Sequence, residues 1–335
     1  MKRIKIQKTD FYNGLYVKKI ETPLKKYYEI EYSDQPDFLF YSVYGSGIDH
    51  YRFDNCVKIF WGCEGVIPDF NECDYAFGSY PMNIGERYLE IPYEAIPRTI
   101  QNREEYRHMD ISNRKFCNFL YSNASLGNGA LLRQEFCKEL MKYKRVDCPG
   151  KVLNNMTDAI EPREGNWHAG KMDFIGQYKF TIAFENCGMP GMITEKLIDA
   201  FRVGSVPIYW GDETVAMRFN TKAFINCHDY SSWEEVIERV KELDQDDWKY
   251  REMLCEKPML PEYDVNYDER IEAFLCDIVE RGNAPFEKNS LSRDAGTNAA
   301  RQLIEMEKTP YYAMYSLQNK IMSGSKRVWN KIKKK

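Results

Sequence analysis

Residues 178–211, YKFTIAFENCGMPGMITEKLIDAFRVGSVPIYWG, decide the fold that this sequence predicts. Apolar and polar residues alternate in 179–185, which is the period of a strand with one buried face. Its apolar positions are Phe180, Ile182 and Phe184. The glycines and proline of 187–191 end the strand and let backbone N–H groups approach a ligand, and Thr194 then caps a helix with one apolar face. Since a second apolar strand follows at 206–210, the stretch predicts one βαβ unit of an α/β domain.

The start of this predicted helix has the features of an anion-binding site. Unpaired N–H groups and the positive end of the helix dipole favour an anion there, and Lys196 adds a full charge. A phosphate group fits these features, while Glu195 could accept hydrogen bonds from the hydroxyls of a ribose. Acidic residues are also common in first turns because of the dipole alone, so the pattern by itself leaves a solvated Glu–Lys pair as the alternative.

Three segments around this site occur in a specific order, FENCGMPGMITEKLIDAF, VPIYWG and FINCHDY. They resemble the donor-binding signature of the α1,3-fucosyltransferases that use GDP-fucose, glycosyltransferase family 10, and the resemblance extends over 115–260. It implies that Glu195 binds the ribose, that Lys196 binds the pyrophosphate and that Asn186 lies near the nucleotide.

Two positions depart from the family's donor signature. Met192 stands where the family commonly has a tyrosine, so this donor-site position lacks that side chain's hydrogen bond to phosphate. A further arginine that the family places on the phosphates has no clear counterpart, because Leu153 falls near its place. Lys151 and Arg163 are the candidates for this second basic residue.

A second region of resemblance is 59–78, IFWGCEGVIPDFNECDYAFG. In the family a strand delivers a glutamate that is followed by Pro, Phe-Asn and Asp-Tyr-Ala, and Glu64 is that residue here. A carboxylate directly after a buried strand lies at the carboxyl edge of the sheet, where open α/β sheets bind ligands. The resemblance makes Glu64 the expected catalytic base, whereas the residue taken alone would be interpreted as a solvated loop glutamate.

The composition is that of a folded protein without a nucleic-acid surface. A chain of 335 residues can form two domains of ordinary size, and its net charge of −4 gives no field that would attract nucleic acid. The 10 cysteines are irregularly spaced without a C-x-x-C pair, and the 4 histidines show no ligand spacing. We therefore expect reduced thiols and no metal site.

Two sequence features indicate where in the cell the protein acts: the expected absence of a membrane or secretion segment, and the basic segment 325–335. We expect neither a secretion signal nor a spanning segment, because no charged start precedes an apolar run and no 18-residue apolar stretch occurs. This favours a cytoplasmic bacterial enzyme. Segment 325–335 contains KRVWNKIKKK, in which a helix would place Val328, Trp329 and Ile332 on one face amid six lysines or arginines. The pattern is typical of a segment bound loosely to an anionic membrane, here the inner face of the cytoplasmic membrane, and a solvated tail is the alternative.

Pattern alone predicts an α/β fold, and the resemblance implies the GT-B architecture, in which two Rossmann-like domains face each other across a cleft. We expect an acceptor-binding α/β domain with the catalytic base in 1–110 and a GDP-fucose-binding Rossmann-like domain in 111–280. Residues 281–335 are predicted to be a linker, rich in Gly, Asn, Ser and charge over 281–300, followed by the basic amphipathic tail.

The implied reaction is the inverting transfer of fucose from GDP-fucose to the 3-hydroxyl of N-acetylglucosamine in a glycan acceptor such as N-acetyllactosamine. One base suffices, because a nucleoside diphosphate leaves as a stable anion and needs no paired acid. We expect no required cofactor, and a divalent cation would at most stimulate the reaction. The alternatives are another GT-B nucleotide-sugar transferase with a different sugar or linkage, and a non-catalytic module that binds a nucleotide or glycan.

Overall fold

The computed structural model of the chain describes most of residues 1–335. The residues not described are 12–13, 46, 63–64, 93–99, 101, 126, 158–166, 264, 287–289, 311, 313, 315–317 and 319–335, together with the side chains of 14–16, 167 and 290–298. Three predictions fall outside the described residues: those for Glu64, for Arg163 and for the basic segment 325–335.

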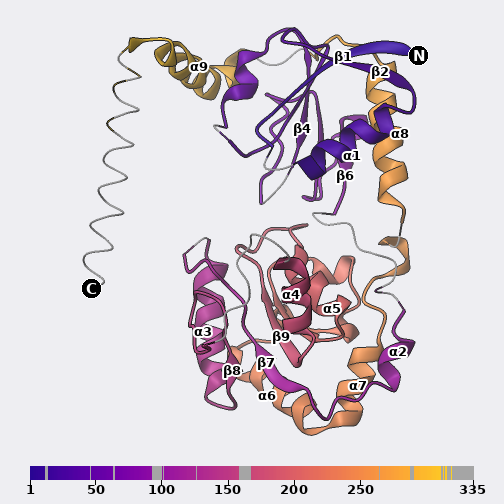
Figure 1. Cartoon of the computed structure of the whole chain (residues 1–335), viewed down its shortest axis with the longest axis vertical. Coiled ribbons are helices and arrows are strands. Elements are labelled where there is room, and N and C mark those ends of the chain that lie inside the picture. Colours follow the sequence, from indigo (N-terminus) through magenta and orange to yellow (C-terminus); the bar gives the residue numbers. More distant parts are fainter. Residues whose placement is uncertain are drawn as a thin grey trace.

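The chain forms two parallel β-sheets with helices packed around them (Figure 1). The six-stranded sheet has the order β2-β1-β3-β4-β5-β6 and the five-stranded sheet has the order β11-β10-β9-β7-β8. The strands of the first sheet are β1 (Lys2–Thr9), β2 (Tyr28–Tyr32), β3 (Phe38–Tyr41), β4 (Val57–Trp61), β5 (Tyr75–Gly78) and β6 (Tyr88–Glu90). Those of the second are β7 (Lys115–Asn118), β8 (Val146–Asp147), β9 (Tyr178–Phe184), β10 (Val206–Trp210) and β11 (Ile225–Asn226). The predicted α/β fold with two Rossmann-like units is confirmed.

The helices are α1 (Gly14–Leu24), α2 (Glu104–Arg107), α3 (Gly129–Met141), α4 (Trp167–Ile175), α5 (Glu195–Arg202), α6 (Trp233–Gln245), α7 (Asp247–Cys255), α8 (Tyr267–Glu280) and α9 (Ser290–Glu307). We call the first sheet with α1, α8 and α9 the first domain, and the second sheet with α2 to α7 the second domain (Figure 1).

Strand β9 lies in the middle of the second sheet, between β10 and β7. All seven of its residues are buried, so the prediction that the strand at 179–185 has only one buried face is wrong. The reason is that helices α3 and α5 both pack against this central strand, so its polar residues are buried together with its apolar ones. Thr181 shows how these positions are satisfied, because its hydroxyl hydrogen-bonds the Ser205 hydroxyl at 2.7 Å.

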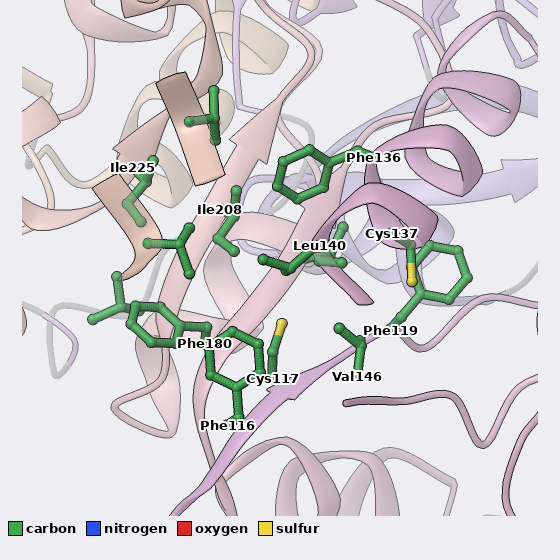
Figure 2. Packing of buried hydrophobic residues seen from close by; sticks show 14 of the residues in the cluster. Phe116, Cys117, Phe119, Phe136, Cys137, Leu140, Val146, Phe180, Ile208 and Ile225 are labelled. Carbon is green, nitrogen blue, oxygen red and sulfur yellow. The ribbon is translucent and has the colours of Figure 1, made fainter. Parts of the chain in front are cut away.

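Helix α3 covers one face of the second sheet through an aromatic and aliphatic core (Figure 2). Phe136, which is fully buried, stacks on Phe184 of β9 with ring centroids 5.2 Å apart. Helical spacing over 127–143 in the sequence alone predicts an apolar face made of Leu131, Leu132, Phe136, Leu140 and Met141. The buried positions are instead Gly129, Ala130, Arg133, Phe136, Cys137 and Leu140. Leu131 is 59% exposed, because the sheet determines which side of the helix faces inward.

The C-terminal helices return to the first domain (Figure 1). Helix α8 contributes Ile271, Leu275, Ile278 and Val279 to the core around the first sheet, although it falls inside the range expected for the second domain. The linker predicted for 281–300 is also wrong in part, because α9 begins at Ser290. Arg301 of α9 pairs with Asp54 at 3.0 Å, so this helix lies against the first domain.

Replacing Phe136 with alanine should destabilise the second domain by about 3–5 kcal/mol, because it removes a fully buried ring and leaves a cavity against β9. Leu131→Ala on the exposed side of the same helix is the matched control, with an expected change within about 0.5 kcal/mol. Urea unfolding followed by circular dichroism measures both. Equal unfolding midpoints for the two variants would contradict the packing described for α3.

Candidate functional site

The candidate site lies where β9 ends and α5 begins, across residues 185–194, which we call the β9–α5 loop. Thr194 is the N-cap of α5, as predicted: its backbone is extended and its side chain accepts a hydrogen bond from the Lys196 N–H. At the other end, Gly204 takes a φ of +66°, a conformation that favours glycine, and α5 stops at Arg202. The sequence therefore defines a short helix whose N-terminus faces the end of β9.

Glu185 ties the end of β9 to the start of α5. This side chain is fully buried, and its Oε1 accepts hydrogen bonds from the Thr194 N–H at 2.7 Å and from the Thr194 hydroxyl at 2.9 Å. Its Oε2 accepts from Lys196 Nζ at 3.1 Å. One carboxylate thus fixes both the capping residue and the cation of the helix start. The sequence had indicated only an outward-facing polar position at Glu185.

Lys196 is held as a cation at this helix start. Burial alone would lower the pKa of Lys196, but the nearby carboxylates of Glu185 and Glu195 outweigh burial and raise that pKa. The Lys196 side chain is 17% exposed, and its Nζ lies 3.5 Å from Glu195 Oε1. Glu195 is 39% exposed, so its carboxylate reaches the surface beside the charge of Lys196. The carboxylate of Glu195 and the ammonium of Lys196 therefore lie side by side at the start of α5.

Arg133 of α3 adds a second cation, which sequence reasoning missed. The residue is buried, and its guanidinium donates to Asn186 Oδ1 at 2.9 Å and to the Asn123 carbonyl at 2.5 Å. Its guanidinium carbon also lies 4.0 Å from the ring centroid of Tyr121. Both acceptors are uncharged, and Arg133 Nε has no hydrogen-bond partner in the described part of the chain. Burial lowers the pKa of Arg133, and Tyr121 and the Glu185 carboxylate offset this effect only in part. An anionic ligand would therefore favour the charged form of Arg133 further.

The sequence did contain a signal for Arg133. Ala130, Arg133, Cys137 and Leu140 recur at three- and four-residue spacing along α3, and all four are buried. An arginine within an otherwise apolar stripe is the kind of buried polar residue that calls for an explanation. The candidate Lys151 lies exposed after β8, and the candidate Arg163 lies outside the described residues.

Met192 lies in the β9–α5 loop, where it is 2% exposed. Its Sδ is 3.4 Å from Cys187 Sγ. A Cβ atom built on Gly65 of the first domain would lie 2.9 Å from the same Sδ, so Gly65 and Met192 are in close contact. The side chain that replaces the family's tyrosine therefore packs against the segment that follows β4.

The described residues contain no cluster of three or more His, Cys, Asp or Glu side chains that could hold a metal ion. The Asp-x-Asp sequence at Asp244 and Asp246 has structural roles: Asp244 accepts from Tyr143 and Lys144, each at 3.0 Å, and Asp246 caps α7. Among the described helices, none combines the length and apolar character needed to cross a bilayer.

A pocket of about 200 Å³ lies between the domains, and Lys196 is not among the residues that line it. Its walls are Ser79, Glu90, Ile91, Pro92, Gly191, Ile193, Ile198, Arg218, Phe219, Met259, Tyr263, Tyr267 and Arg270. The two segments that connect the domains contribute to it, so this pocket lies at the junction of the domains.

Two parallel α/β units place the chain in the class of proteins with two Rossmann-like domains. The chain belongs to glycosyltransferase family 10, the fucosyltransferases: the profile described as "Glycosyltransferase family 10 (fucosyltransferase) C-term" matches residues 112–290. A second profile, "Alpha-(1,3)-fucosyltransferase FucT N-terminal domain", matches residues 6–96. The two matches fall on the two sheets.

Relatives of known name agree with this family. The chain is 29% identical over 258 residues to the α-(1,3)-fucosyltransferase FucT of Helicobacter pylori, covering 67% of this chain and 52% of that protein. It is 32% identical over 172 residues to GDP-fucose protein O-fucosyltransferase 3 of Xenopus tropicalis, covering 44% of this chain and 36% of that protein. The chain thus spans about half the length of the curated relatives it matches, or less.

A solved structure agrees with the fold as well. A crystal structure of an α1,3-fucosyltransferase with GDP-fucose superimposes on this chain with a TM-score of 0.65 at 25% identity. The superposition covers 84% of this chain and 91% of the other, so both domains and their arrangement are shared.

Proposed function

We propose that this protein transfers L-fucose from GDP-fucose, with inversion, to the 3-hydroxyl of N-acetylglucosamine in a β-galactosyl-N-acetylglucosamine acceptor. The observation that carries the proposal is a pair of cations beside the β9–α5 loop: Lys196, whose ammonium pairs with Glu185, and the buried Arg133 of α3, whose hydrogen-bond acceptors among the described residues are uncharged. In a chain of the fucosyltransferase family, these cations fit the pyrophosphate of the donor.

Each donor-site residue has a role in this proposal. Lys196 and the first N–H groups of α5 bind the phosphates, and Arg133 supplies the second cation that the sequence left open. Glu195, with its partly exposed carboxylate, accepts hydrogen bonds from the ribose hydroxyls. Asn186 lies beside the nucleotide, with its side chain held by Arg133. Met192 contributes an apolar contact in place of the family's tyrosine.

The chemistry is a single displacement with Glu64 as the base. Glu64 removes the proton from the acceptor hydroxyl as that oxygen forms a bond to the anomeric carbon of fucose. The bond between this carbon and the phosphate oxygen breaks, so GDP leaves as an anion and the β-linked donor becomes an α-linked product. Lys196 and Arg133 stabilise the charge that develops on the phosphate. With this charge compensated by the protein, a divalent cation would be stimulatory at most.

The acceptor proposal favours a glycan over a protein hydroxyl. The relative named as a protein O-fucosyltransferase matches 44% of this chain, whereas the Helicobacter pylori α-(1,3)-fucosyltransferase matches 67%. The first domain, which we propose binds the acceptor, matches an α-(1,3)-fucosyltransferase N-terminal profile over residues 6–96. The product would be a Lewis-type glycan or a surface polysaccharide.

Lys196→Ala should weaken GDP binding by about 1.5–3 kcal/mol, the usual contribution of a hydrogen bond to a charged group. The reason is that the ammonium at the helix start is lost. Because Lys196 also pairs with the buried Glu185 carboxylate, circular dichroism is used to compare the affinities at equal fractions of folded protein. Lys249→Ala, an exposed lysine of α7 paired with Glu242, is the matched control and should leave the affinity unchanged. Isothermal titration calorimetry with GDP measures all three proteins, and equal affinities would exclude Lys196 from the site.

Wild-type protein should form an α1,3-linked fucosyl product from GDP-fucose and N-acetyllactosamine, and Glu64→Gln should lower this turnover by about 10²–10⁴-fold. Glutamine keeps the size of the side chain but cannot accept the proton, so GDP affinity should stay near the wild-type value. Product formation is measured by mass spectrometry, and linkage and anomeric configuration by NMR.

Glu29→Gln, which removes an exposed carboxylate from β2, is the control for charge and should keep wild-type turnover. Near wild-type turnover in Glu64→Gln, or a product with the β configuration, would show that the single displacement is wrong. A screen of glycan and peptide acceptors is the further test. If the protein transfers fucose to another acceptor and not to N-acetyllactosamine, the proposed acceptor or linkage is wrong.

The segment 325–335 is proposed to attach the enzyme loosely to an anionic membrane, where a lipid-linked acceptor would lie. Each basic residue near such a surface contributes about 1 kcal/mol, and salt screens the attraction. Full-length protein should therefore sediment with phosphatidylglycerol vesicles at low salt and be released at high salt, while a variant lacking 325–335 should stay in the supernatant. If neither protein sediments at low salt, the segment is a solvated tail.

A further inference from the structure

The β9–α5 loop is also the place where the second domain touches the first. Gly191 in this loop has a φ of +80°, and a Cβ atom there would collide with the Ser79 carbonyl oxygen just after β5. A Cβ atom on Gly65 would likewise lie 2.9 Å from Met192 Sδ. At Gly191 the loop approaches the backbone of the first domain closely, whereas at Gly65 the contact is with the end of the Met192 side chain. The Gly191 contact therefore ties the position of this loop to the end of β5.

Asp212, which follows β10, holds the backbone of the β9–α5 loop. This carboxylate is fully buried, and its Oδ2 accepts a hydrogen bond from the Gly191 N–H at 2.8 Å. Its Oδ1 accepts from the Thr214 N–H and from the Thr214 hydroxyl, each at 2.7 Å. Asp212 therefore connects the loop to the end of the neighbouring strand β10.

Arg218 extends this connection to the first domain. One end of its guanidinium, Nη1, lies 3.4 Å from Asp212 Oδ2. The other end, Nη2, donates a hydrogen bond of 2.5 Å to Oε1 of Glu90, which lies at the end of β6. The Arg218 side chain is 14% exposed, so this bridge is largely sheltered from solvent. A planar guanidinium can join two carboxylates in this way, whereas the ammonium of a lysine is a single point charge.

We propose that Arg218 is a positioning residue that holds the first domain in register with the donor site, through the connection Glu90–Arg218–Asp212–Gly191. The inference rests on the proposed function, in which Glu64 follows β4 of the first domain while the donor residues lie in the second. Transfer requires base and donor to be aligned closely, and a shift of about 1 Å can cost about 10²-fold in rate. Binding of GDP requires only the second domain.

The proposal predicts that binding and turnover separate in Arg218→Met. The turnover number per GDP-binding site should fall by about tenfold to a hundredfold, while the GDP dissociation constant stays within about threefold of wild type. Calorimetry with GDP counts competent sites and gives the affinity, and transfer from GDP-fucose to N-acetyllactosamine gives turnover. Arg218→Lys should lose an intermediate amount, because it keeps the charge without the bidentate geometry.

Glu90→Gln tests the same connection from the first domain. Because glutamine is nearly isosteric with glutamate, this variant tests the role of Arg218 if Arg218→Met does not fold. It should lower turnover in the same direction, and the double variant should lose little more than Arg218→Met alone, because the two residues act through one contact. Arg281→Met is the matched control: it removes an arginine that pairs with Glu86 and Asp277, at 2.7 Å each, away from the β9–α5 loop. Its turnover per site should equal that of wild type.

Three results would overturn the proposal. Wild-type turnover per GDP-binding site in Arg218→Met, or in Glu90→Gln where the first variant does not fold, would reduce Arg218 to a role in stability. A parallel loss of GDP affinity and turnover would place its effect in the donor site itself. If the wild-type protein has no transfer activity, the proposed function itself is wrong, and the role proposed for Arg218 is then wrong too.

Discussion

The buried carboxylate of Glu185 is the interaction on which the candidate site depends. It has no access to solvent, and it is compensated by the N–H and hydroxyl of Thr194 and by the ammonium of Lys196. Removing a carboxylate from water is costly, so such a group persists only with strong partners. Those partners are the capping residue and the cation of α5, and the end of β9 is thereby fixed to the start of the helix. The geometry of the candidate site therefore depends on one buried carboxylate.

The same loop connects chemistry to domain arrangement. Glu185 at the start of the β9–α5 loop pairs with Lys196, and Asn186 accepts a hydrogen bond from Arg133. Further along the same loop, Gly191 contacts Ser79 and Met192 contacts Gly65, both in the first domain. Helix α8 is a second connection, because it follows the second domain in the chain and packs into the core of the first sheet.

Local sequence rules predicted much of the fold. Strand patterns bounded by turn residues predict strands at 3–7, 27–32, 38–44, 57–61, 75–78 and 87–91, and these ranges coincide with β1 to β6 to within a few residues. Helical patterns likewise predict helices at 233–243, 248–254 and 267–279, where α6, α7 and α8 lie, and Thr194 is the predicted cap of α5. Helix α1 was missed, and α9 was taken as part of a linker.

Local sequence patterns are enough to predict the α/β class and the βαβ unit around 178–211, and the motifs point to Glu195 and Lys196 as candidates. Which faces are buried and which distant residues meet depends on how the whole chain packs. Glu185 occupies an alternating polar position that predicts exposure, and the two helices packed on β9 reversed that prediction. Arg133 is separated from Asn186 by 53 residues, and Glu90 from Arg218 by 128, so no local pattern could pair them. Such contacts depend on the register of the sheets and on the packing of the domains, which are properties of the whole chain.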